Sequence, residues 1–303
     1  MLNRYEHSGL TWIDLEAPTA EEAEAVVKEF NLDPSYITEI VSPTLKPRLD
    51  VYAQYLYLVL HFPAYRHMHG FVADHEVDII VGKSFMITVH YEVVTAIRDF
   101  AAAFEAAVLL KRKSALHAGH VVLELVRYLY RGVEGELDAI EESVTDIERA
   151  IFRGLERDMV KPISMTMREL LHHKRLLASQ DDELKELERV GASLFGSTDK
   201  THLSQIPTIH YRVYTRALTL VETLSELRAT NDSLLSTKQN EITKNLTIVA
   251  SIMLPLSLVA SVFGMNTEHT PIVGHQLDFY IILALLSAIG LVLLAYFIFK
   301  RWF

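Results

Sequence analysis

Apolar residues are concentrated near the C-terminal end of this chain, in two long uncharged segments. The first runs from Leu246 to Phe263, with only Thr, Ser and Pro255 between its apolar residues, and the second runs from Phe279 to Phe299. Each has about 18 to 21 residues, which at roughly 1.5 Å per helical residue is enough to cross a hydrocarbon core about 30 Å thick. The pattern predicts two transmembrane helices joined by a short loop.

Basic residues flank these two segments on one side only. Lys244 precedes the first segment and Lys300 and Arg301 follow the second, whereas the loop 265–278 has acidic residues but no Lys or Arg. By the positive-inside rule, both chain ends lie in the cytoplasm and the loop lies outside. We therefore expect a multi-pass protein of the cytoplasmic (inner) membrane. The N-terminus has no apolar h-region, so no cleaved signal is expected.

The first 90 residues show a different pattern, with short runs of aromatic and β-branched residues that are typical of strands. These runs are 12–15, 55–61, 77–81 and 85–90. Helices are expected at 19–30, where Thr19 and Glu22 resemble a capping box, and at 34–41. Turns are expected at Pro63, Gly70 and Gly82. Together these elements predict a mixed α/β domain.

Beyond this domain the strand patterns stop, and helices are expected at 94–113, 117–153, 162–194 and 208–264. The last would have about 55 residues and a length of roughly 80 Å, so we expect a stalk that continues into the membrane. The predicted organisation is an α/β cytoplasmic domain (1–92), a cytoplasmic helical region (93–207), the stalk helix (208–245), a first transmembrane helix (246–264), an extracytoplasmic loop (265–278), a second transmembrane helix (279–299) and a basic cytoplasmic tail (300–303).

Small and polar residues recur along the last long helix in alternating steps of three and four. Counted backward from the membrane end they are Ser261, Ser257, Leu254, Ala250, Thr247, Thr243, Asn240, Ser236, Ser233, Ala229, Glu226 and Glu222. A repeat near 3.5 predicts left-handed supercoiling against copies of the same helix. A neighbouring stripe forms an apolar seam of Val213, Ala217, Leu220, Leu224, Leu227 and Leu234.

This stripe changes from Ser, Thr and Ala within the membrane to Glu222 and Glu226 below it. Small residues also permit tight helix packing in lipid. Carboxylates at one end of the stripe would not help helix packing, however, whereas they would attract cations to a conduction path. Two spans per chain cannot enclose a pore, so several copies must surround it, and cyclic symmetry then turns each residue into a ring.

Composition narrows the class of protein. The chain has 303 residues, 50% of them hydrophobic, and a formal net charge of -10. The negative charge argues against a general nucleic-acid binder. It is consistent with a cytosolic domain that attracts cations, and the ordinary need for solubility explains it equally well. Cysteine is absent, which excludes disulfides and thiolate metal sites. The sequence has no nucleophile-and-base spacing or glycine-rich nucleotide loop, so we expect neither an enzyme nor an organic cofactor.

The end of the first span reads Phe263-Gly264-Met265-Asn266. The amide of Asn266 offers a carbonyl oxygen to the waters of a hydrated cation. Mg²⁺ dehydrates reluctantly, so a site that accepts its water shell is easier to build than one that strips it. A carboxylate would bind more tightly and release more slowly, and conduction requires release. Glu268 either concentrates cations or is a solvated loop charge.

Several motifs are shared with a known family: Phe263-Gly-Met-Asn, Asn240-Glu-Ile-Thr-Lys-Asn-Leu-Thr-Ile-Val-Ala, Met253-Leu-Pro-Leu-Ser, Lys300-Arg-Trp, Lys46-Pro-Arg-Leu-Asp-Val-Tyr and Tyr55-Leu-Tyr-Leu-Val-Leu-His-Phe-Pro. In these the chain resembles the CorA family of magnesium and divalent metal ion transporters. The resemblance implies a homopentameric funnel in the membrane, in which the first span lines the pore and the second packs outside. Magnesium is the implied transported ion, with cobalt or nickel as further candidates and a regulatory role for magnesium open.

The resemblance also implies roles for particular residues. Gly264, Met265 and Asn266 would form the selectivity filter. Asn266 is the candidate metal contact in this filter, and Glu268, just outside it, is a second candidate from its position alone. The implied pore-lining residues are Ser261, Ser257, Leu254, Ala250, Thr247, Leu246, Thr243 and Asn240, with Leu254 and Leu246 as hydrophobic constrictions. The cytoplasmic vestibule would contain Ser236, Ser233, Glu226 and Glu222.

The chain departs from the family where internal magnesium would gate it. The family pattern Asp-Val-Tyr-Asp reads Arg212-Val-Tyr-Thr215 here, so we do not expect that acidic site to operate. His67 and His69 are a candidate zinc or nickel pair, although two ordinary loop histidines are the preferred interpretation. His172 and His173 are expected at the surface.

Two other functions stay open. The first is a zinc or other transition-metal transporter of the ZntB type, against which the Gly-Met-Asn sequence argues. The second is a membrane-anchored scaffold or sensor, which leaves the polar stripe unexplained.

Overall fold

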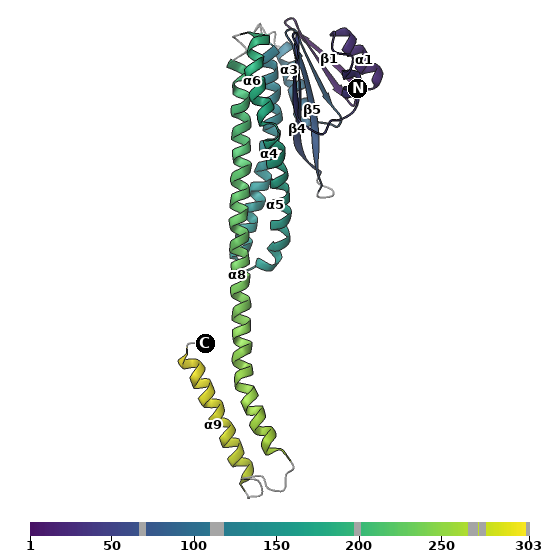
Figure 1. Cartoon of the computed structure of the whole chain (residues 1–303). Helices are drawn as coiled ribbons and strands as arrows, with labels where there is room; N and C mark the ends of the chain where they lie inside the picture. Colours follow the sequence, from purple (N-terminus) through teal and green to yellow (C-terminus); the bar gives the residue numbers. More distant parts are fainter. Residues whose placement is uncertain (67–70, 110–117, 197–200, 266–271, 273–276, 301–303) are drawn as a thin grey trace. The chain divides into compact units, whose positions relative to one another are not determined.

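The computed structural model describes residues 1–66, 71–109, 118–196, 201–265, 272 and 277–300 (Figure 1). The chain divides into two compact units, Met1–Arg228 and Ala229–Phe303. The long helix α8 (Gln205–Phe263) begins in the first unit and ends in the second. The expected order of an α/β domain, a long helix and two apolar C-terminal helices is confirmed.

A six-stranded sheet forms the first part of the chain, with the strand order β1-β2-β6-β5-β4-β3. Among these strands β2 and β6 pair in parallel, and the other neighbours are antiparallel. The strands are β1 (Leu2–His7), β2 (Leu10–Glu16), β3 (Arg48–Val51), β4 (Tyr55–Arg66), β5 (Phe71–Gly82) and β6 (Phe85–His90). All four predicted strands are confirmed, and the chain turns after Gly82 as expected.

Helices cover both faces of the sheet. On one face α1 (Ala20–Glu29) and α2 (Tyr36–Val41) pack over a buried core that includes Ile13. Side chains alternate along a strand, so the neighbouring Trp12 points to the other face. There its ring centroid lies 4.8 Å from that of Phe100 in α3 (Thr95–Leu109). The predicted capping box at the start of α1 is present.

Three features of the sheet differ from the prediction. Strands β1 and β3 were missed because neither has a fully buried residue, so neither carries an apolar signal. The turn expected at Pro63 is wrong, since Pro63 lies inside β4 and pairs with Asp74. Strand β3 covers β4 only from Leu56 to Val59, so the missing N–H of Pro63 breaks no bond to β3.

The helical region also differs from the prediction at one point. The single helix expected at 162–194 is two helices, α5 (Glu156–Ala178) and α6 (Asp181–Phe195), which follow α4 (Ala118–Phe152). The break between them contains Gln180, whose buried side chain donates to the carbonyl of His61 and accepts from the hydroxyl of Tyr130 at 3.3 Å. The start was misplaced because Pro162 lies inside α5, where it removes one hydrogen bond without ending the helix.

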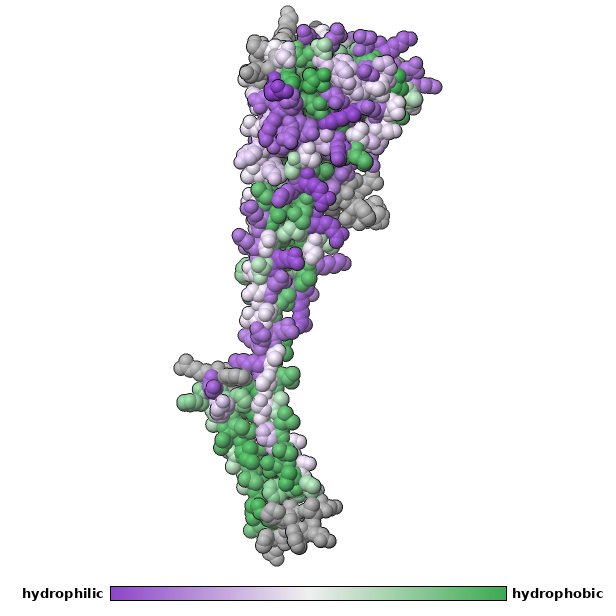
Figure 2. Space-filling view, in the orientation of Figure 1, coloured by the Kyte–Doolittle hydropathy of each residue, from purple (hydrophilic) through white to green (hydrophobic). Residues whose placement is uncertain are grey.

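The second unit contains the end of α8 and the helix α9 (Asp278–Phe299). By length and composition, these are two helices that can cross a membrane. Figure 2 shows that hydrophobic residues cover most of their surface. The predicted spans are therefore confirmed as apolar helices.

Candidate functional site

Helix α9 covers one face of α8. Ile248 in α8 is only 3% exposed, and Phe297 in α9 is 8% exposed. A Cβ at Gly290 would lie 3.7 Å from Cδ1 of Leu256, so the two helices meet closely at this glycine. The buried and half-buried residues of this part of α8 are Ile248, Ser251, Ile252, Pro255, Leu256, Val259 and Phe263, and we call them the α9 face.

The small and polar stripe lies on the other side of α8. At 3.6 residues per turn, its members between Thr243 and Ser261 are centred roughly 160° around the helix axis from the α9 face. Every predicted pore-lining residue is exposed, namely Ser261, Ser257, Leu254, Ala250, Thr247, Leu246, Thr243 and Asn240. Helix α9 thus leaves this face uncovered, and a single chain cannot enclose it.

One hydroxyl group on the stripe, that of Thr247, is held in a particular orientation. The hydroxyl of Thr247 donates to the backbone carbonyl of Thr243 at 2.8 Å, one helical turn earlier. This bond uses the only hydroxyl proton, so the oxygen lone pairs remain as acceptors. Water in the shell of a cation presents its hydrogens outward. The acceptor lone pairs of Thr247 therefore match a hydrated cation rather than a bare one.

Two leucines interrupt the polar stripe. Leu246 is 68% exposed and Leu254 is 69% exposed, so neither is needed to pack α8 against α9. They are two helical turns apart, about 12 Å along the axis. Rings of leucine at these two levels would be hydrophobic constrictions of the kind that close a pore by excluding water.

Helix α8 ends at the filter motif. The N–H of Gly264 donates to the carbonyls of Ala260 at 3.0 Å and Ser261 at 3.2 Å, and Met265 is exposed. A Cβ at Gly264 would lie 3.3 Å from the carbonyl oxygen of Ala260, which is a tight contact. Asn266 and Glu268 lie outside the described residues, so their roles stay predictions.

The other end of the stripe lies beside a packed seam. In the unit Met1–Arg228, the predicted apolar seam is buried at Val213, Ala217, Leu220, Leu224 and Leu227. Glu222 and Glu226 are exposed on the neighbouring face of α8. In the second unit the last seam residue, Leu234, is half-buried, and the vestibule residues Ser233 and Ser236 are exposed. In the unit Met1–Arg228 the chain buries the seam by itself.

Two arginines hold α8 to α4, and one of them, Arg212, stands where the family pattern has an acidic residue. Arg212 donates to Oε1 of Glu134 from Nε at 3.2 Å and from Nη2 at 2.9 Å. One turn later Arg216 lies 2.6 Å from Asp138 and also pairs with Glu141. The hydrogen bond that Arg216 donates to Glu141 raises the pKa of Arg216, so this group stays charged. These pairs neutralise one side of α4.

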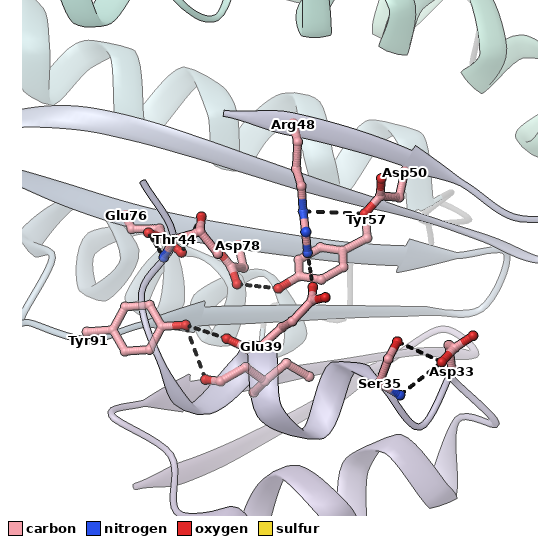
Figure 3. A network of polar contacts seen from close by, with 11 residues as sticks. Asp33, Ser35, Glu39, Thr44, Arg48, Asp50, Tyr57, Glu76, Asp78 and Tyr91 are labelled. Carbon is pink, nitrogen blue, oxygen red and sulfur yellow. Dashed lines mark hydrogen bonds and ion pairs between the residues drawn. The ribbon is translucent and has the colours of Figure 1, made fainter. Parts of the chain in front are cut away.

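A buried carboxylate pair in β5 was not predicted from the sequence (Figure 3). Asp78 is fully buried and accepts a hydrogen bond from the hydroxyl of Tyr57 at 2.6 Å. Glu76 accepts from the backbone N–H of Thr44 at 2.6 Å and lies 3.2 Å from Nε2 of His61. Burial raises the pKa of Asp78 well above its ordinary value, and the charge of Glu76 adds to the effect. The available signal was that Glu76 and Asp78 lie next to the apolar run 79–81 of the same strand.

This network connects the sheet to the segment after α2. Arg48 in β3 pairs with Glu39 and lies 3.3 Å from Asp50, and the hydroxyl of Tyr91 donates to the carbonyls of Glu39 and Ile40 (Figure 3). Within the described residues, no group of three or more His, Asp or Glu is placed to hold a metal ion.

The histidines give a mixed outcome. His173 is fully buried, with Nε2 3.1 Å from Glu136 and Nδ1 3.0 Å from the carbonyl of Glu169, so the expected surface position is wrong. His172 pairs with Asp74 at 2.6 Å. Adjacent helical residues point about 100° apart, and here one of the two points into the α4–α5 contact. His67 and His69 lie outside the described residues.

Comparisons with known proteins agree over nearly the whole chain. The family described as "CorA-like Mg2+ transporter protein" matches residues 7–301. A putative metal ion transporter of Bacillus subtilis, YfjQ, is 24% identical over 96% of this chain and 89% of its own length. The cobalt/magnesium transport protein CorA of Thermotoga maritima is 22% identical over 96% of this chain and 83% of its own length.

Solved structures show the same fold. The complete CorA magnesium transporter from Methanocaldococcus jannaschii has a TM-score of 0.85 at 19% identity, covering 99% of this chain and 93% of the other. The cytoplasmic domain of ZntB from Vibrio parahaemolyticus has a TM-score of 0.52 at 12% identity, covering 78% of this chain and 88% of the other. The likeness extends to both apolar C-terminal helices in the first of these.

Proposed function

The chain belongs to the CorA-like Mg²⁺ transporter family, and on this basis we propose that it is a channel-like importer of hydrated divalent cations, chiefly magnesium, in the cytoplasmic membrane. Cobalt and nickel are further candidates. Five copies would form a ring in which α8 lines the conduit and α9 packs outside it, with both chain ends in the cytoplasm.

The observation that carries this proposal is the uncovered face of α8. It lies away from α9, and it leads to Gly264 and Met265 at the membrane end. Ser, Thr, Ala and Asn line it, together with Leu246 and Leu254. A lipid-facing surface would favour larger apolar side chains, because polar groups are costly in hydrocarbon. Copies of this face around an axis would instead give a passage lined by hydrogen-bond acceptors.

Selectivity would arise at the mouth of this passage. A ring of Asn266 amides would accept hydrogen bonds from the inner waters of the cation, so that Mg²⁺ keeps its first shell. Neutral oxygens hold the ion weakly enough to release it. Two charges moving down a potential of about 100 mV gain roughly 4.6 kcal/mol, so uptake needs no nucleotide hydrolysis.

Two other functions stay open, a zinc transporter and a membrane-anchored scaffold or sensor. The likeness of the soluble region to ZntB supports a zinc transporter, whereas the Gly-Met-Asn sequence favours magnesium. A membrane-anchored scaffold or sensor would explain two apolar helices but needs no polar face on α8.

Ion flux into liposomes separates the three functions. Purified protein in liposomes with an internal fluorescent indicator is exposed to magnesium, cobalt or zinc under an imposed inside-negative potential. We expect magnesium influx that Asn266→Ala abolishes while the oligomer remains intact by size-exclusion chromatography. Asn266→Asp should bind magnesium more tightly and pass it more slowly.

The outcomes that reject the proposal are equally definite. Zinc flux that excess magnesium does not inhibit would assign the protein to the zinc class. Liposomes that pass no cation at all would favour the scaffold. Unchanged flux in Asn266→Ala would reject the filter assignment alone.

A further inference from the structure

A cavity of about 390 Å³ lies between α4 and α8 in the unit Met1–Arg228. Each helix contributes four residues with the spacing i, i+3, i+4 and i+7, so one face of each helix forms a wall of the groove. These residues are Arg127, Tyr130, Arg131 and Glu134 from α4 and Gln205, Thr208, Ile209 and Arg212 from α8. None of them belongs to the predicted conduit.

The charge of this groove is opposite to that of the chain. Three guanidinium groups and one carboxylate line it, which gives the lining a net charge of +2 within a chain of formal net charge -10. Glu134 is already paired with Arg212 at 2.9 Å. Among the described residues, the guanidinium of Arg131 has no carboxylate partner and lies 5.1 Å from the ring centroid of Tyr128. One full positive charge thus remains uncompensated beside the cavity.

The other two guanidinium groups are held in place by neighbours. Arg127 bonds Glu124 in its own helix and Oε1 of Gln205 in α8, the latter at 2.6 Å. Arg212 uses Nε and Nη2 for Glu134, which leaves the two N–H groups of Nη1 for a further acceptor. Positions fixed in advance reduce the ordering cost of binding a ligand. Thr208 adds an exposed hydroxyl to the wall.

We propose that this groove binds a phosphate-bearing anion with two or three negative charges, of the pyrophosphate or nucleotide polyphosphate class. Guanidinium groups present forked N–H donors that match phosphate oxygens in pairs. A cavity of 390 Å³ accommodates a small ligand of this size. The bound anion would bridge Arg131 of α4 and Arg212 of α8, and so strengthen the contact between these helices.

Isothermal titration calorimetry tests this site on the full chain in lipid-free detergent, in buffer without magnesium, with pyrophosphate as the probe. We expect saturable binding that weakens about tenfold in Arg131→Gln, because one charge-assisted contact is removed. Arg131→Lys keeps the charge but loses the fork, and should bind with intermediate affinity. Arg149→Gln is the matched control, since Arg149 lies on the same helix, outside the cavity, paired with Asp146 at 3.1 Å.

Several results would overturn the proposal. Absence of pyrophosphate binding by the native chain would reject the site. An equal loss of affinity in Arg149→Gln would mean that positive charge attracts pyrophosphate nonspecifically and that the groove is not a site. Glycerol 3-phosphate serves as a soluble analogue of a lipid headgroup, and tighter binding of this probe than of pyrophosphate would assign the groove to lipid instead. Circular dichroism of Arg131→Gln checks that the fold is retained, as we expect for a side chain that has no ion pair within the described part of the chain.

Discussion

Apolar side chains are buried near the start of α8 and exposed near its end. Toward its start, Leu224 and the rest of the seam are buried by helices of the same chain. Toward its end, Leu254 and Leu258 are 69% and 67% exposed, although the helix is continuous. The chain buries the apolar residues near the start of α8 by itself. Under the proposed function, lipid and other copies of α8 would cover the exposed leucines at its end.

A charge in the seam should have the largest effect. Leu224→Asp places a carboxylate where no solvent reaches, and we expect it to lower the free energy of unfolding by about 3 to 5 kcal/mol. Thermal unfolding followed by circular dichroism measures this loss. Ser225→Asp, the exposed neighbour, should have little effect. Equal stability of the two variants would mean that the seam does not hold α8 to the first unit.

The next effect concerns the buried carboxylate of β5. Asp78→Ala leaves the hydroxyl of Tyr57 without its acceptor in the core, at a cost of about 1 to 3 kcal/mol. Asp78→Asn keeps an acceptor oxygen and should cost less. Thermal unfolding of both variants measures the difference, and equal loss in both would show that the bond from Tyr57 is unimportant.

The same residue predicts a dependence on pH. Because the folded state raises the pKa of Asp78, this group favours folding fully below the ordinary aspartate pKa. That contribution is lost as pH rises through the raised value. Asp78→Asn should therefore flatten the fall in melting temperature as pH rises above about 4. An unchanged slope in the variant would contradict this assignment.

A smaller change is expected at the leucine constriction. Leu254→Ser on the uncovered face should raise magnesium flux several-fold with the oligomer intact, because a hydrophobic barrier to water is removed. Leu256→Ser, two residues away on the α9 face, should instead weaken packing against α9 without raising flux. Flux in liposomes and size-exclusion chromatography distinguish these outcomes. A rise in flux from Leu256→Ser but not Leu254→Ser would reverse the orientation proposed for α8.

The smallest effect should come from the acidic end of the stripe. Glu222→Gln combined with Glu226→Gln should lower magnesium flux about two- to threefold at low ionic strength, because fewer cations gather there. The difference should vanish in high salt. Glu241→Gln, an exposed acid of α8 away from the stripe, is the control. A loss that persists in high salt would indicate direct ion contact instead.

Much of the fold could be predicted from the sequence, because the periodic apolar positions are also the positions that the structure buries. The four inner strand segments and the long helices follow their apolar patterns closely. The errors have physical causes. Strand β1 is exposed at an edge and therefore lacks an apolar signal, Pro162 is tolerated inside α5, and Gln180 breaks a helix through contacts with His61 and Tyr130 that are distant in sequence.

The candidate site was readable to a different extent. A period near 3.5 identified the exposed face of α8, since position on a helix surface follows directly from spacing. The pairing of Asp78 with Tyr57 and the burial of His173 depend on residues from other elements, and no local pattern encodes them. The same holds for the arginine groove, whose two walls are separated by more than 70 residues of sequence.

Helix α9 covers only one side of α8, and this arrangement has a genetic consequence. Each chain would supply one wall of a shared passage, so a defective copy would impair every assembly that it joins. With random mixing of equal amounts of normal and defective chains into rings of five, only about 3% of the rings contain no defective copy. Inactive alleles altered at the filter would therefore be dominant over the normal allele, whereas alleles that prevent folding would be recessive.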